Sequence, residues 1–351
     1  MMSLETLWLA LLGLLLAGYF VLGGYDYGVQ MLHPFLGGRD GHDGHDGHDG
    51  QEAGRPGRNA ALDAIAPFFL GNEVWLVAFA GVMFGAFPHL EGSLLSGLYP
   101  LIVAILVGLV LGNAAIQLRG RAHSARGRRL WEALIVFGGA LPALCWGLVV
   151  GLLLRGLPRR ADGSFHVGFG EVFTPFVLAC GVTTALLFAA HGAAFVALRS
   201  APGLAAEARR LGATLLRVSG AVGTLPLLLT LFGAGASMTN RVTAAVIAVL
   251  LAAALAGAWW YLSWGHHVRA FAATCCATLL PVLLVGAGHY PYVLISSAGA
   301  GMTIDQAVAD GATLKILSVF GVLVVPTILA YQTWSWWVFR GRTGRRHPSY
   351  F

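Results

Sequence analysis

The sequence predicts an all-α fold: a polytopic integral membrane protein of about nine transmembrane helices, with residues 1–351 forming a single membrane domain. Two observations support this class. Hydrophobic residues make up 57% of the chain and charged residues only 11%, whereas a soluble domain carries about a quarter charged residues. Residues 94–118 and 242–265 contain no charge over the roughly 20 residues that cross a hydrocarbon core. So few charges cannot coat a water-facing surface, and lipid must cover the remainder.

Nine apolar segments follow one another along the chain and are separated by polar loops. The break between the seventh and the eighth is only His266-His267-Val268-Arg269. The 48 glycines suit helices whose backbones approach closely in a bilayer. The predicted spans are 6–36, 61–88, 94–118, 131–154, 171–198, 211–235, 242–264, 270–290 and 313–339.

The arginines are distributed unevenly between alternating loops. If the C-terminus is cytoplasmic, sixteen arginines lie in cytoplasmic segments and four lie on the opposite face. Cytoplasmic loops carry an excess of basic residues, so we predict an N-terminus outside and a cytoplasmic C-terminus. The net charge of +6 then reflects membrane topology, and we expect no nucleic-acid partner.

Residues 37–58 do not have a membrane pattern, because they repeat Gly-His-Asp from Gly41 and are rich in glycine and charge. Such a segment cannot bury a core, and we predict a flexible cytoplasmic loop. His42, His45 and His48 alternate with aspartates and would chelate a divalent metal weakly. The alternative is repeat expansion in a tolerant loop, and we predict no other metal site.

The first span contains an ionisable residue, which is costly in lipid and needs a partner, water or a proton path. Asp26 lies within Gly23-Gly24-Tyr25-Asp26-Tyr27-Gly28, a glycine-rich break where the glycines would either let backbones approach closely or loosen the helix. Asp26 would then either handle protons or brace the broken helix. The sequence leaves both roles open.

The second span carries Asn72, Glu73 and Trp75 after Pro67. In a helix, Asn72 and Trp75 share a face, because they are three residues apart, and Glu73 points about 100° away from Asn72. A buried glutamate beside an amide can carry protons, and it can equally hydrogen-bond a neighbouring subunit.

His191 lies within the fifth span. A haem site needs a second axial ligand and a cleft for the macrocycle, and the sequence indicates neither. We therefore do not predict His191 to be a haem ligand, and we predict no catalytic or cofactor-binding residue in this chain.

Several separated segments together resemble one family, subunit II of cytochrome bd quinol oxidases, over about residues 10–340. The Gly-Asn-Glu-Val-Trp block is the most specific of them. The segments are Gly24-Tyr25-Asp26-Tyr27-Gly28-Val29, Ile65-Ala66-Pro67, Gly71-Asn72-Glu73-Val74-Trp75-Leu76, Thr174-Pro175-Phe176, His191-Gly192-Ala193, Thr313-Leu314-Lys315 and Tyr331-Gln332.

This resemblance implies a terminal oxidase of the bacterial cytoplasmic membrane that oxidises quinol and reduces O2 to water. It implies that haem b and haem d are held by subunit I, the main partner, and that this chain is a non-haem subunit. It also leaves room for a small accessory subunit and for a structural quinone or lipid. Asp26, Asn72, Glu73 and Trp75 would then serve proton passage or subunit bracing.

Leu70 departs from the family pattern, since members often carry an aspartate there that is assigned to a proton channel. Leucine cannot carry a proton, so Glu73 would replace it, or protons would enter only through subunit I. The alternative function is a secondary transporter with Asp26 and Glu73 as coupling carboxylates at broken helices. The lack of a recognisable inverted repeat argues against it.

Overall fold

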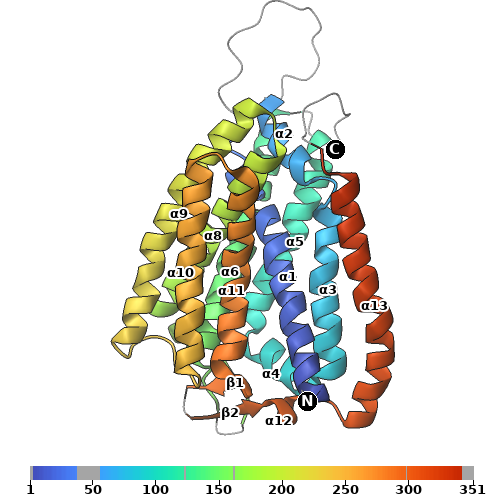
Figure 1. The fold of residues 1–351 in the computed structure, drawn as a ribbon, viewed down its shortest axis with the longest axis vertical. Coiled ribbons are helices and arrows are strands. Elements are labelled where there is room, and N and C mark those ends of the chain that lie inside the picture. Colours follow the sequence, from blue (N-terminus) through green and yellow to red (C-terminus); the bar gives the residue numbers. More distant parts are fainter. Residues whose placement is uncertain (1–2, 38–55, 122–123, 161–162, 298, 342–351) are drawn as a thin grey trace, which may run out of the picture.

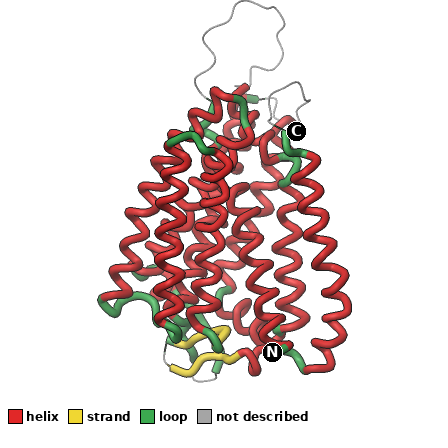
Figure 2. Tube along the Cα trace, in the orientation of Figure 1, coloured by secondary structure: helices red, strands yellow, loops and turns green. Residues whose placement is uncertain are grey.

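The computed structural model describes residues 3–37, 56–121, 124–160, 163–297 and 299–341. These residues form a bundle of long helices standing side by side, with a small hairpin at one end (Figures 1 and 2). Nine of the described helices are long and apolar enough to cross a membrane. The predicted all-α membrane class is therefore confirmed.

The spanning helices are α1 (Leu4–Leu32), α3 (Phe69–Ala86), α5 (Tyr99–Leu118), α6 (Ala125–Arg155), α8 (Pro175–Arg199), α9 (Pro202–Leu231), α10 (Arg241–Ser263), α11 (His267–His289) and α13 (Gly311–Val338). The shorter elements are α2 (Pro56–Ile65), α4 (Pro88–Gly97), the 3-10 turn η1 (Arg119–Arg121), α7 (Phe169–Val172), α12 (Ile304–Ala307) and the strands β1 (Tyr292–Ser296) and β2 (Gly299–Thr303).

Prolines set several helix boundaries that the apolar pattern placed differently. The second predicted span divides into α2 and α3 around Pro67, because proline lacks an N–H and disfavours helix at the residue before it. The third predicted span begins within α4, and α5 starts afresh with Pro100 in its first turn. Pro175 and Pro202 likewise occupy the first turns of α8 and α9.

The polar stretch before the last span contains the main departure from an all-helical chain. β1 and β2 pair antiparallel, with Leu294 opposite Met302, and α12 follows directly. This hairpin lies at the end of the bundle where α1 begins (Figure 1). The N- and C-terminal ends lie at opposite ends of the bundle, as an odd number of spans requires.

The predicted glycine-rich break in α1 is wrong, because α1 is continuous from Leu4 to Leu32. The glycines permit close approach, which is the other role predicted for them. A Cβ on Gly28 would collide with the backbone of Phe188 and Gly192 in α8, and a Cβ on Gly192 would collide with Gly28. At this crossing only glycine lets the two backbones touch.

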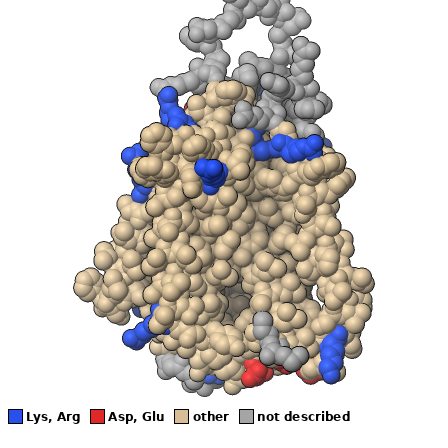
Figure 3. All heavy atoms as spheres, in the orientation of Figure 1, with Lys and Arg blue, Asp and Glu red and all other residues tan. Residues whose placement is uncertain are grey.

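Charged side chains on the surface of the bundle lie mainly at its two ends, and few lie between them (Figure 3). Figure 3 shows this on the face in view, with more Lys and Arg at the end where the C-terminus lies. The arginines of η1, together with Arg209 and Arg269, belong to that end by their position in the helices. Which end faces the cytoplasm stays a prediction from the arginine distribution.

Candidate functional site

Asn72 is the centre of a buried polar network. It lies on α3 with no exposed surface, and its Nδ2 donates to Tyr25 Oη at 2.7 Å and to Asp26 Oδ2 at 2.8 Å. Asp26 is 1% exposed. The Asn72 amide therefore donates both of its protons to side chains of α1. One of these bonds satisfies one oxygen of the deeply buried Asp26 carboxyl group.

The same amide is held from the other side by α13. Gln332 Nε2 donates to Asn72 Oδ1 at 3.3 Å, and Trp75 Nε1 donates to Gln332 Oε1 at 3.3 Å. The network therefore joins α1, α3 and α13. Asn72 and Trp75, which sequence spacing placed on one face of a helix, are both buried and both contact Gln332.

A second polar group extends from Asp26 along α1. Asp26, Gln30 and His33 are separated by four and three residues, so they follow one face of the helix toward its C-terminal end, and all three are buried. Asp26 Oδ1 and Gln30 Oε1 have no hydrogen-bond partner among the described residues. Buried acceptors of this kind are normally paired with a donor.

Glu73 is not part of this network. It is half-buried on α3, and its carboxyl group lies close to the side chain of Asn113 on α5. Leu70 is 64% exposed on the outside of the bundle, whereas Glu73 lies against a neighbouring helix. The two positions therefore have different surroundings even though they are close on the helical wheel.

The surroundings of His191 do not fit a haem ligand. Its Nε2 donates to the backbone oxygen of Val21 at 2.9 Å, and its Nδ1 lies 2.8 Å from Thr274 Oγ1. The imidazole also stacks on Phe271, with ring centroids 5.0 Å apart. Both ring nitrogens are engaged and the ring face is covered, so iron could bind only if this packing were broken.

An aromatic cluster covers the network. Tyr25 stacks on Phe195 with 4.2 Å between ring centroids, and Trp336 of α13 lies 5.1 Å from Phe68. The Arg199 guanidinium lies over the Phe68 ring, with 5.3 Å between its central carbon and the ring centroid. α13 thus contributes both a hydrogen bond and an aromatic contact at the same level.

Sequence reasoning missed Tyr25 and Gln332 as members of the site. Gln332 offered a usable signal, since an amide in a long apolar span needs a partner there. Tyr25 offered little signal, because a tyrosine within a span more often only packs against its neighbours. His33 and His289 lie at helix ends and are both buried.

Among the described residues, no group of three His, Cys, Asp or Glu side chains could hold a metal ion. His42, His45 and His48 of the Gly-His-Asp repeat lie outside the described residues, so their suggested weak chelation stays a prediction.

The fold and this network define a class: a multi-pass helical membrane protein with a carboxyl group in its core that is hydrogen-bonded by the side-chain amide of Asn72. The model of the family "Cytochrome bd terminal oxidase subunit II" matches residues 4–339, and the chain therefore belongs to that family.

Known relatives agree with this assignment over nearly the whole chain. The chain is 29% identical to the cytochrome bd ubiquinol oxidase subunit 2 of Bacillus subtilis, over 99% of each chain. It is 25% identical to the cytochrome bd-I ubiquinol oxidase subunit 2 of Escherichia coli K12, over 97% of this chain and 95% of the other. A chain from the structure of the bd oxidase of Geobacillus thermodenitrificans shares the fold, with a TM-score of 0.70, 17% identity and coverage of 96% and 99%.

The predicted function is thereby confirmed. The chain is a subunit of a quinol:O2 oxidoreductase, its complex contains haems and a partner subunit, and it is a multi-pass membrane protein. The comparisons give no support to the secondary-transporter alternative.

Proposed function

We propose that this chain is the haem-free subunit of its oxidase, lies in the bacterial cytoplasmic membrane with a cytoplasmic C-terminus, and braces a haem-bearing subunit I. Haem b and haem d would both belong to that partner. The engaged nitrogens of His191 support the haem-free part. A small accessory subunit and a structural quinone or lipid stay predictions from the family resemblance.

The Asn72–Gln332 contact carries the bracing role. It fixes α13 to the core at one level, while large apolar side chains on α13 stay exposed along its length, such as Val319 at 66% and Leu323 at 66%. The neighbouring α3 adds Leu70 and Val77 to the exposed apolar surface. A rigidly held apolar face of this extent suits a helical partner subunit.

Proton handling is a second candidate role, and the stripe of Asp26, Gln30 and His33 favours it. The stripe leads from the network toward the end of α1 that the arginine distribution makes cytoplasmic. Protons consumed in reducing O2 would then enter this subunit from the cytoplasm. Glu73 would serve separately, at the contact between α3 and α5.

The haem-free assignment is tested on the complex and on this chain alone. We expect the co-expressed, purified complex to show haem absorbance and quinol oxidase activity. The chain purified without its partner should show no haem absorbance. A haem spectrum from the isolated chain would refute the assignment.

The proton role is tested with Asp26→Asn and Glu73→Gln, since both keep the side-chain shape and remove the titratable group. Slower turnover with normal assembly would indicate proton passage, whereas loss of the complex would indicate bracing. Asp305→Asn, at an exposed residue of α12, is the control. Unchanged turnover and unchanged assembly in both variants would remove both roles for these residues.

A further inference from the structure

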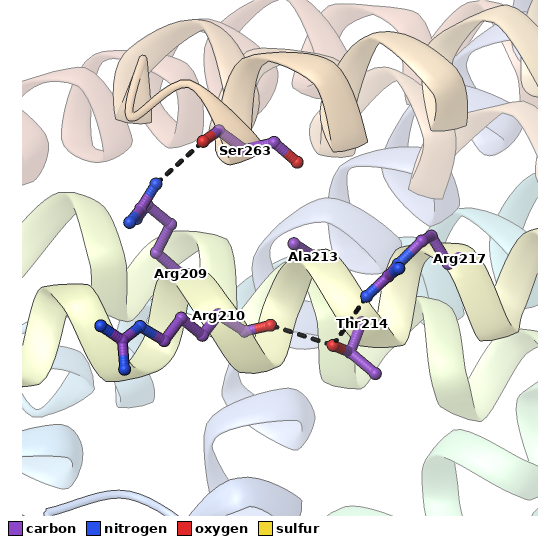
Figure 4. A pocket seen from close by; sticks show the side chains of 6 residues that line it. All are labelled: Arg209, Arg210, Ala213, Thr214, Arg217 and Ser263. Carbon is purple, nitrogen blue, oxygen red and sulfur yellow. Dashed lines mark hydrogen bonds between the residues drawn. The ribbon is translucent and has the colours of Figure 1, made fainter.

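A basic groove of about 310 Å³ opens between α9 and α10. Figure 4 shows the residues that line it and their contacts. All of them come from one helix except Ser263, which closes the groove from the end of α10. The lining residues are Arg209, Arg210, Ala213, Thr214, Arg217 and Ser263.

The three arginines of this groove form no ion pair with a carboxylate of the described residues. Arg209 Nη1 donates to the backbone oxygen of Ser263 at 2.8 Å, and no carboxylate of the described residues lies within 4.0 Å of any of the three guanidinium groups. The nearby acid Glu207 accepts instead from the backbone N–H of Gly37 at 2.9 Å. Three guanidinium groups therefore offer many unused donors to an anion.

The groove lies at the level of lipid headgroups. Trp260 and Trp264 flank Ser263 on α10 and are 54% and 66% exposed, and exposed tryptophans mark the membrane interface. Arg209 lies at the same level, because its guanidinium group hydrogen-bonds the backbone oxygen of Ser263. Arg217 lies eight residues further into the bundle, about 12 Å along the helix axis.

Arg217 turns back toward that interface. Its Nη2 donates to Thr214 Oγ1 at 3.3 Å, one turn nearer to the start of α9 (Figure 4). A basic side chain at this depth commonly directs its charge toward the headgroups while its stem stays in the apolar layer. Arg209, Arg210 and Arg217 thus lie between the interfacial end and the middle of α9, although Figure 4 shows the Arg210 guanidinium turned away from Arg217.

An exposed apolar stripe continues directly from the groove. Arg210, Thr214 and Arg217 follow helical spacing, and the same face goes on to Leu225 and Leu228. These two leucines are 45% and 46% exposed. One face of α9 is therefore basic at headgroup level and apolar below it. This pattern is complementary to an anionic phospholipid, which has a charged headgroup above apolar acyl chains.

We propose that this groove binds the headgroup phosphate of an anionic phospholipid, with Arg209, Arg210 and Arg217 as donors and an acyl chain along Leu225 and Leu228. The apolar stripe and the depth of Arg217 favour a lipid over a soluble phosphate, which would use only the groove. This site does not depend on the proposed bracing or proton roles.

The test uses the whole complex with its partner subunit in nanodiscs of phosphatidylcholine doped with phosphatidylglycerol. Native mass spectrometry after release would count the retained phosphatidylglycerol. We expect retention at this site to weaken about fivefold for each arginine removed, in Arg210→Gln and in Arg210→Gln/Arg217→Gln. Equal retention by wild type and the double variant would overturn the proposal.

Arg128→Gln/Arg129→Gln is the matched control, because it removes two exposed charges from α6 at the same end of the bundle. It should retain phosphatidylglycerol as wild type does, and equal loss there would show a nonspecific charge effect and contradict the site. The Arg210 side chain makes no hydrogen bond to the other described residues, so Arg210→Gln should fold normally. Displacement of phosphatidylglycerol by equimolar inorganic phosphate would overturn the choice of a lipid.

Discussion

α8 and α13 are alike in length and apolarity but differ in what surrounds them. The most apolar part of α8 has a mean hydropathy of 1.8 and that of α13 has 2.1, yet 72% of the residues in the first are buried against 6% in the second. Hydropathy measures transfer out of water, and a helical neighbour satisfies it as well as lipid does. Apolarity therefore identifies a span without showing whether protein covers it.

The two helices are also held by different forces. α8 contacts α1 backbone to backbone at Gly192 and Gly28. α13 depends on separate polar contacts: the Asp310 cap at its start, the hydrogen bond from Trp8 to Ser318 at 3.2 Å, and Gln332 in the polar network. Packing contacts in α8 should therefore tolerate substitution far less than the anchors of α13.

The largest effect should come from Gly28→Leu, which drives a side chain into the backbone of α8. We expect a loss of about 3 kcal/mol or more of stability, with little folded protein recovered. Yield and thermal midpoint in detergent would measure it. Gly220→Leu is the control, since a Cβ there meets nothing within 4 Å. A normal midpoint for Gly28→Leu would contradict the close crossing.

Asn72→Leu should have the next largest effect, because it leaves Asp26 and Tyr25 without their amide donor. A buried polar group left unpaired costs about 1–3 kcal/mol. The thermal midpoint of the complex would report the loss. In a double-mutant cycle with Asp26→Leu the two losses should be non-additive. Strict additivity would show that the contact contributes nothing to stability.

Gln332→Leu should have a smaller and more local effect. It removes one anchor of α13 and should cost about 1 kcal/mol. Hydrogen exchange should rise in the second half of α13 while α8 stays protected. Thr327→Val, which loses only a bond to its own helix, is the control. Increased hydrogen exchange in α8 would mean that the two helices unfold together, which would contradict their being held by different contacts.

The smallest effect should come from the cap of α13. Asp310 Oδ1 accepts from the backbone N–H groups of Ala312 and Thr313 at 2.9 and 3.0 Å. The hydrogen bonds from Thr313 lower the pKa of Asp310. The ionised cap is therefore fully stabilising above its unfolded pKa of about 3.9, and its contribution disappears as pH falls through the lower folded pKa.

Asp310→Ala should accordingly lower the thermal midpoint slightly at pH 7, with a difference from wild type that shrinks below about pH 4. Asp310→Asn should retain most of the cap, since asparagine also accepts at this position. A difference between wild type and Asp310→Ala that grows in acid would contradict the role of the charge.

The sequence predicted the fold more completely than it predicted the contacts of the polar core. The nine spans followed from long apolar runs with few charges, and their ends moved mainly where Pro67, Pro100 and Pro175 reset a helix. The side chains of Asp26, Asn72 and Trp75 were identified because polar or amphipathic groups in an apolar span need partners. Their partner Gln332 is 260 residues from Asn72, and no local pattern connects the two.

The sequence by itself determined the membrane class and the nine spans, because transfer into lipid depends on composition and local order along the chain. The oxidase family was indicated separately, by the resemblance of motifs such as Gly71-Asn72-Glu73-Val74-Trp75. Only the tertiary structure decided that α1 runs unbroken through Gly23 and Gly24, that Glu73 faces Asn113 while Asp26 faces Asn72, and that α13 stands almost uncovered. These outcomes depend on which helices are neighbours. In a bilayer, close packing and buried hydrogen bonds choose those neighbours, and a residue's own hydropathy does not encode them.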